Sequence, residues 1–217
     1  MLYQLEFDFG NLMMIINIII SSLLISGYIF IVIGGASNLK GNEKLKGSIF
    51  LLIIGVVEII YEHFKWLLQF DFFYEFFNDF EFSYRFSYTI SYIVPHLISI
   101  ITFGVLILIL GVWNKENLGK SLITSGILMI IYAANQLIFS SLLYDFLPLT
   151  LPANINAIII IISTSIIAFL IVSRIFLLLY AIKIKEKYLL TSSIILLIAS
   201  QLLLFYKILE LIYLFII

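Results

Sequence analysis

Five stretches of this chain run for about 20 residues or more without a charged side chain. They lie between Asp8 and Lys40, Arg85 and Lys115, Lys120 and Asp145, Asp145 and Arg174, and Lys187 and Lys207. A helix of ~20 apolar residues crosses the ~30 Å hydrocarbon core of a bilayer, whereas a barrel strand is much shorter. The stretches therefore predict five membrane-spanning helices.

A sixth span is predicted between Lys46 and Asp71, although Glu58, Glu62 and Lys65 interrupt it. The chain is 63% hydrophobic and 12% charged, which is too apolar for an ordinary soluble domain. The sequence therefore predicts an all-α, polytopic integral membrane protein that forms a single domain in the lipid bilayer. The expected spans are 11–35, 48–70, 88–113, 121–144, 153–182 and 189–215.

Lysines indicate the orientation, because eight of the twelve basic residues fall in three short connections. These are Lys40, Lys44, Lys46, Lys115, Lys120, Lys183, Lys185 and Lys187. Basic loops stay in the cytoplasm, so we expect a cell-membrane protein with both termini outside. Glu6 and Asp8 stand where a signal peptide would carry basic residues, so residues 11–35 are interpreted as a retained span.

Three helical hairpins follow from this arrangement, each turning on a basic loop, with loop centres near residues 43, 117 and 185. Their spacing of about 70 residues suggests three repeats. Ordinary membrane hairpins would look similar, so both interpretations stay open.

Small residues are expected at the helix contacts, and Pro95 is expected to kink the third span. The small residues are Ser22, Ser26, Gly27, Gly34, Gly35, Gly104 and Gly111.

The segment 70–88 combines eleven aromatic residues with four acids on the outer side. It is expected to lie in the headgroup layer as an aromatic belt. An alternative is a lid or a docking surface for a second copy of the chain or for other membrane subunits.

Polar residues of several spans fall at one depth when ~1.5 Å per residue is counted from the basic end of each helix. Glu58 lies ~15 Å deep and Gln136 ~23 Å. Polar groups that faced lipid would lack partners, so we expect them to face one another in a chamber between the midplane and the outer leaflet. The candidate substrate-binding or ion-binding residues are Glu58, Glu62, His96, Tyr132, Asn135, Gln136 and Gln201.

A carboxylate near the midplane typically marks an ion path, a proton relay or a ligand contact. The alternative for Glu58 and Glu62 is a protonated, hydrogen-bonded structural pair. Lys65, Arg174 and Lys207 are interpreted as interfacial anchors that reach water. No basic partner is therefore expected at the depth of Glu58.

His63 and His96 are the two histidines of the chain and fall on consecutive spans. A pair of this kind can ligate a b-type haem, or bind a metal ion together with an acid. Glu62 is adjacent to His63 but points ~100° away around the helix axis, which weakens this hypothesis. Hydrogen bonding within the bundle is the alternative.

Several functions are disfavoured by what the sequence lacks. A net charge of −1 gives no basic surface for nucleic acid, and the absence of cysteine removes thiol chemistry. Hydrolase, zinc-protease and P-loop motifs are missing, which disfavours an enzyme.

The leading hypothesis is a transporter-like protein or a membrane-embedded binding subunit. The competitors are a haem-bearing or metal-bearing redox subunit and a structural or sensory module of a larger complex.

Overall fold

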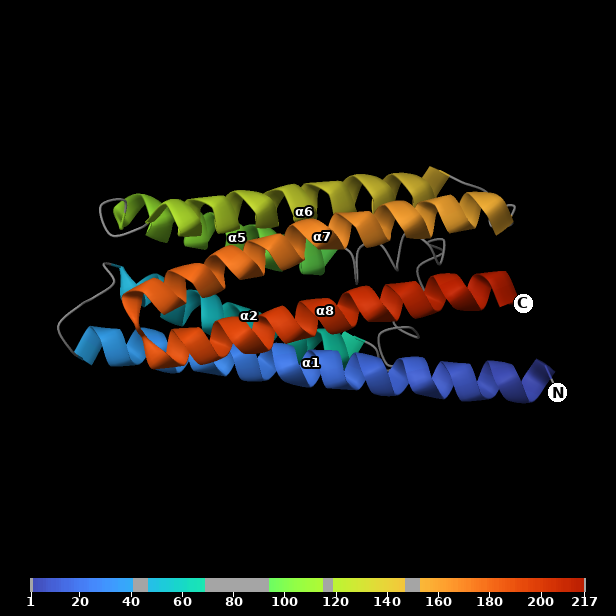
Figure 1. Cartoon of the computed structure of the whole chain (residues 1–217), viewed down its shortest axis with the longest axis horizontal. Helices are drawn as coiled ribbons and strands as arrows, with labels where there is room; N and C mark the ends of the chain where they lie inside the picture. The colour runs from blue at the N-terminus through green and yellow to red at the C-terminus, as the bar shows by residue number, and fades with distance from the viewer. Residues whose placement is uncertain (1, 41–46, 69–93, 115–118, 147–152, 217) are drawn as a thin grey trace, which may run out of the picture.

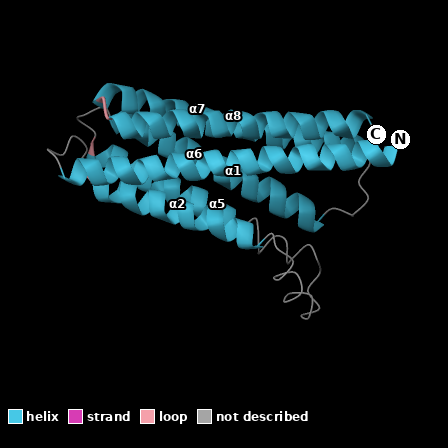
Figure 2. Cartoon of the chain, turned by 90° about the horizontal axis from the view of Figure 1, so that it is seen from below, coloured by secondary structure: helices cyan, strands magenta, loops and turns pink. Residues whose placement is uncertain are grey.

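The computed structural model describes residues 2–40, 47–68, 94–114, 119–146 and 153–216. Within these ranges the chain forms six α-helices and no strand (Figures 1 and 2). The helices are α1 (Leu2–Lys40), α2 (Ser48–Leu68), α5 (Val94–Trp113), α6 (Gly119–Phe146), α7 (Ala153–Ile184) and α8 (Lys187–Ile216). The predicted all-α class is confirmed. Segment 70–88 lies outside the described residues, so its expected roles as an aromatic belt, lid or docking surface stay predictions.

Among the described residues, three helices are long and apolar enough to cross a membrane, and a fourth apolar stretch is shorter. The long ones are Asn11–Leu39, Thr164–Ile184 and Lys187–Tyr213, and the shorter one is Ile98–Trp113. Only 28%, 44% and 33% of the residues in the three long windows are buried inside the bundle. More than half of the residues in each window are therefore at least partly exposed, and lipid is the solvent that accepts their apolar side chains. Six crossings remain a prediction.

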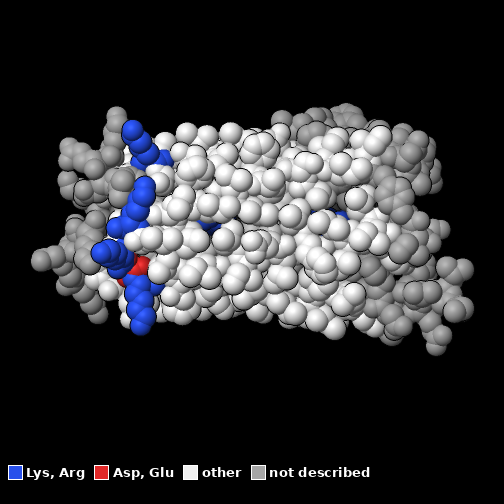
Figure 3. Space-filling model, in the orientation of Figure 1, with Lys and Arg blue, Asp and Glu red and all other residues white. Residues whose placement is uncertain are grey.

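The helices form a closed ring in chain order. Each helix packs against the next one along the chain, from α1 through α2, α5, α6 and α7 to α8, and α8 packs against α1. The hairpins α1–α2, α5–α6 and α7–α8 turn at one end of the bundle, and both termini lie at the other end (Figures 1 and 2). Lysines gather at the end that carries the turns, while the middle of the visible surface is almost uncharged (Figure 3). Three hairpins are thus confirmed, but their origin as repeats is not tested.

Glycines bring neighbouring backbones into contact. A Cβ atom added to Gly126 of α6 would lie 2.6 Å from the carbonyl oxygen of Gly104 of α5. A Cβ atom on Gly27 of α1 would lie 2.7 Å from Leu196 of α8. Such packing is how apolar helices associate in lipid, where burying apolar surface gives little advantage. The expectation for Ser22 is wrong, because Ser22 faces outward and its hydroxyl donates to the Ile18 carbonyl of the same helix at 2.8 Å.

Pro95 is the second residue of α5 as described, so the expected kink inside this span is not seen. A proline in the first turn costs little, because the N–H that it lacks has no partner within the helix at that position.

At the opposite end of the bundle, Glu186 caps α8 by accepting a hydrogen bond from the backbone N–H of Leu189. Lys185, with φ of 54°, completes the tight turn between α7 and α8.

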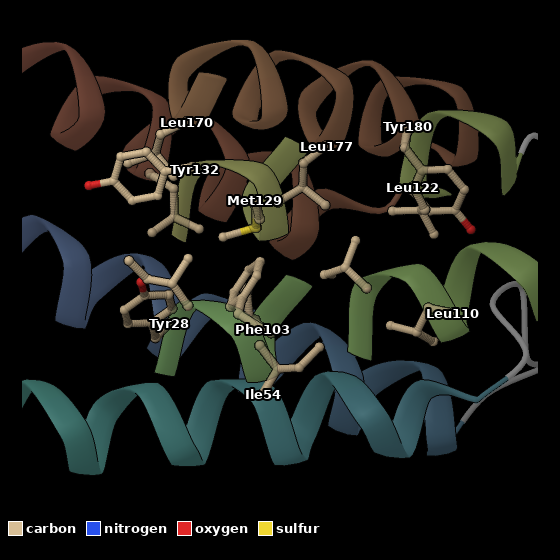
Figure 4. Close-up of a cluster of buried hydrophobic side chains, with 14 of the residues drawn as sticks. Tyr28, Ile54, Phe103, Leu110, Leu122, Met129, Tyr132, Leu170, Leu177 and Tyr180 are labelled. Carbon is tan, nitrogen blue, oxygen red and sulfur yellow. The ribbon is translucent and has the colours of Figure 1, made fainter. Parts of the chain in front are cut away.

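The core is a cluster of buried side chains that runs along the bundle axis. Figure 4 shows it extending from Tyr180 at one end, through Phe103, to Tyr28 and Tyr132 at the other. These residues come from α7, α5, α1 and α6, so the ring closes around a shared interior. The two tyrosines mark the place where this apolar interior becomes polar.

Candidate functional site

A cavity of about 50 Å³ lies at this polar end of the core. All six described helices contribute to its wall. Its polar lining consists of Tyr28, Glu58, Tyr61, Glu62, Ser99, Tyr132, Arg174 and Ser200, and the remaining lining residues are apolar. A volume of this size has room for a few water molecules or a small solute. We call this space the central cavity.

Glu58 reaches the central cavity from α2, ten residues after the helix begins at Ser48. The helical rise places it ~15 Å from the end that carries the basic turns. Its side chain is 3% exposed, and the Ser99 hydroxyl of α5 donates a hydrogen bond of 2.6 Å to its Oε2 atom. Its Oε1 atom has no hydrogen-bond partner among the described residues. Glu62, one turn further along α2, is also buried and lines the same space.

Arg174 enters the central cavity from α7 on the opposite side of the ring, and it is 3% exposed. Its Cζ atom lies 4.6 Å from the centre of the Phe103 ring, a cation–π contact. Within the described part of the chain, its Nε and Nη1 atoms have no hydrogen-bond partner. The interpretation of Arg174 as an interfacial anchor is therefore wrong. It lies ten residues before Ile184, which puts it ~15 Å from the end of α7. At that depth the side chain of an arginine is too short to bring its guanidinium to the water at the membrane surface.

Tyr28 connects the two charges, because its side chain interacts with both Glu58 and Arg174. Arg174 also interacts electrostatically with Glu58 and with Tyr132. In a medium of low dielectric such interactions are stronger than at a protein surface. The basic partner that the sequence analysis did not expect is thus present at the depth of Glu58.

The candidate residues divide into those that line the central cavity and those that do not. Glu58, Glu62 and Tyr132 line it. Gln136 is half-buried and interacts with Tyr132, but it is not part of the wall. Asn135 is half-buried, and its Nδ2 atom donates to the Ile131 carbonyl of its own helix at 2.8 Å.

Gln201 faces outward, contrary to expectation, and its neighbour Ser200 lines the cavity instead. The two side chains differ by ~100° around the helix axis, which separates the inner face of α8 from its outer face. The Ser200 hydroxyl donates to the Leu196 carbonyl at 2.9 Å.

The histidines occupy different environments. His63 is exposed on the outside of α2, and its Nδ1 atom donates to the Ile59 carbonyl at 2.7 Å. His96 lies in the first turn of α5, and its side chain is outside the described residues. No group of three or more His, Cys, Asp and Glu side chains suited to a metal ion occurs in the described ranges. The haem or metal hypothesis gains no geometric support from His63.

Comparisons of this chain with models of known families, with curated proteins and with solved structures find no match. Function must therefore be argued from the central cavity alone. In the described structure, that space offers donors on Arg174 and an acceptor on Glu58 that have no hydrogen-bond partner, together with aromatic walls. Water molecules, an ion or a small solute with complementary groups would remove the cost of leaving these buried atoms without partners.

Proposed function

We propose that this protein is a transporter-like membrane protein whose central cavity binds a small polar or charged solute. The observation that carries the proposal is the pair of buried charges, Glu58 and Arg174, which line one cavity. Each has polar atoms without a hydrogen-bond partner among the described residues. Ionisable groups are costly at this depth, and functional sites are the usual places where membrane proteins retain them.

A structural module is the main competitor, since a buried ion pair can also fix the register of a bundle. The two proposals differ in whether water reaches the central cavity. A transporter opens its site to one side of the membrane at a time, whereas a structural ion pair stays sealed in the packed interior.

Cysteine labelling provides the test, because the natural chain contains no cysteine that would react. Ser200→Cys places a thiol in the central cavity, and Ser22→Cys places one on the outer face of α1. The two serines are matched, since each hydroxyl donates to the carbonyl four residues earlier in its own helix. With a charged, water-soluble methanethiosulfonate, the Ser200→Cys thiol should react at least tenfold faster than the Ser22→Cys thiol. Equal, negligible rates from both sides of the membrane would support the structural module instead.

We also propose that the basic turns face the cytoplasm and both termini face outward. The gathering of lysines at one end of the bundle supports this orientation (Figure 3). Epitope tags at either terminus should be accessible to antibody in intact cells, and a tag inserted near residue 117 should become accessible only after permeabilisation. The reverse accessibility would invert the orientation and move the central cavity toward the inner leaflet.

A further inference from the structure

Two buried groups of opposite charge border the central cavity, one on each side of the ring. Glu58 belongs to α2 and Arg174 to α7, and these two helices stand opposite each other in the ring of described helices. Arg174 interacts with Glu58 electrostatically. Within the described structure, however, the Oε1 atom of Glu58 and the Nε and Nη1 atoms of Arg174 have no hydrogen-bond partner. The two sides of the cavity therefore offer an acceptor and donors at the same time.

A ligand that satisfies both sides must carry two different ends. A cationic group with N–H donors fits the Glu58 carboxylate, and a carboxylate fits the planar guanidinium of Arg174. A lone cation or a lone anion would fill one of these roles and leave the buried atoms on the other side without partners. Because Glu62 has an interaction of its own, the contact with the cationic end is assigned to Glu58.

The cost of burying charge also favours a ligand with both ends. A molecule that carries one positive and one negative group is neutral overall, so its entry leaves the net charge of the buried site unchanged. A singly charged ligand changes that net charge, which is expensive away from water. This argument holds whatever the other ionisable groups near the cavity contribute, because the ligand adds no net charge.

The size of the central cavity limits the ligand. Its volume of about 50 Å³ has room for roughly three to five water molecules, or for a solute with about as many non-hydrogen atoms. Apolar residues such as Ile20, Leu24 and Leu170 form much of the remaining wall, so further polar groups on the ligand would find few partners there. Glycine, the smallest amino acid, matches these limits.

We propose that the central cavity binds a small zwitterion such as glycine, with its ammonium group at Glu58 and its carboxylate at Arg174. This inference rests on the proposed function and names the class of its solute. The bound zwitterion bridges α2 and α7 through charge-assisted hydrogen bonds on both sides. Bound water is the alternative occupant, and it would fill the same space without any preference for a molecule that carries both charges.

Equilibrium binding of radiolabelled glycine to the purified full-length protein in detergent micelles provides the test, with scintillation proximity as the readout. The wild-type protein should bind glycine saturably, and excess unlabelled glycine should displace the label. Acetate and methylammonium each carry one half of the zwitterion, and acetamide has donors and an acceptor without charge. Each of the three should compete at least about tenfold more weakly than glycine.

Variants assign the ligand contact to Glu58. Glu58→Gln removes the charge that faces the ammonium group, so glycine should bind at least about tenfold more weakly and should compete no better than acetate. A change in packing alone would not alter this order of the competitors. Glu210→Gln is the matched control, because Glu210 lies on α8 outside the central cavity and is paired with Lys207 at 2.6 Å. Its affinity for glycine should equal that of the wild-type protein.

Three results would overturn the inference. They are the absence of saturable glycine binding up to millimolar concentration, equal competition by acetamide and glycine, and a Glu58→Gln protein that binds glycine like the wild type. If glycine does not bind while the Ser200→Cys thiol still reacts with the water-soluble reagent, the proposed solute-binding function survives and only the assignment of a zwitterion fails. If the thiol is also inert, both proposals fail.

Discussion

Arg174→Met should lower the free energy of unfolding by about 3–5 kcal/mol, because it leaves the buried carboxyl groups of the central cavity without their counter-charge. Methionine is a flexible apolar side chain that can still pack against Phe103, so most of the loss should report the missing charge rather than a void. Thermal unfolding in detergent micelles, together with titration by a denaturing detergent, measures the effect.

Two further variants separate charge from shape. Arg174→Lys keeps the charge but loses the planar group that lies 4.6 Å from the Phe103 ring centre, so it should cost less than Arg174→Met. The double variant Arg174→Met with Glu58→Gln removes a charge of each sign. It should be more stable than Arg174→Met alone, with a coupling of about 0.5–3 kcal/mol between the two sites. Additive effects would show that Arg174 and Glu58 do not interact energetically.

Most helices of the described ranges follow from the sequence because uninterrupted apolar length is a strong physical signal, although α1 (Leu2–Lys40) is longer than the predicted span 11–35. Predicted spans 48–70, 121–144, 153–182 and 189–215 correspond closely to α2, α6, α7 and α8. Charge placement was also informative, since the described lysines gather at one end of the bundle and both termini lie at the other (Figures 1 and 3).

The rotation of each helix about its axis was much harder to predict. The lipid-facing surface of a membrane helix is as apolar as its packed surface, so α7 and α8 carry little of the two-sided pattern that marks a helix in water. Only polar residues then report which face is inside, and Ser200 and Gln201 give conflicting signals. The amide looked like the stronger candidate, yet the serine faces the central cavity. Small side chains are favoured at close helix contacts, which is a reason to prefer the serine.

Arg174 was missed for a different reason, although the sequence contained the necessary signal. It lies ten residues from the basic end of α7, and Glu58 lies ten residues from the basic end of α2. Equal counts from the same end of the bundle mean equal depth at ~1.5 Å per residue. Opposite charges at equal depth in a membrane protein are expected to pair. Counting every charged residue from the end of its own span would have placed the two together. Tyr28 gave no comparable signal, because a single tyrosine in a charge-free apolar span does not by itself indicate a polar site.

Glu58→Gln and Glu58→Leu should have clearly different effects on stability. The glutamine amide oxygen can still accept the hydrogen bond that the Ser99 hydroxyl donates at 2.6 Å to the native carboxylate. We therefore expect Glu58→Gln to change the free energy of unfolding by less than about 1 kcal/mol. Leucine offers no acceptor at all, so the buried Ser99 hydroxyl and the Arg174 guanidinium both face an apolar side chain, and the change should cost about 3 kcal/mol or more. Ser99→Ala, which removes only the donor, should cost about 1 kcal/mol and serves as the control.

The same pair of variants separates a structural glutamate from one that carries charge. If Glu58 only links helices, Glu58→Gln keeps both its fold and the proton-coupled flux of the wild-type protein, measured in liposomes that enclose a pH indicator. If Glu58 carries an exchangeable charge, Glu58→Gln keeps its fold but loses at least nine-tenths of that flux, because an amide cannot gain or lose a proton in this way. A Glu58→Leu protein more stable than wild type, with Glu58→Gln unchanged in every assay, would contradict both roles. Glu58 would then neither bond across the bundle nor hold charge, and the central cavity would lose its principal acceptor.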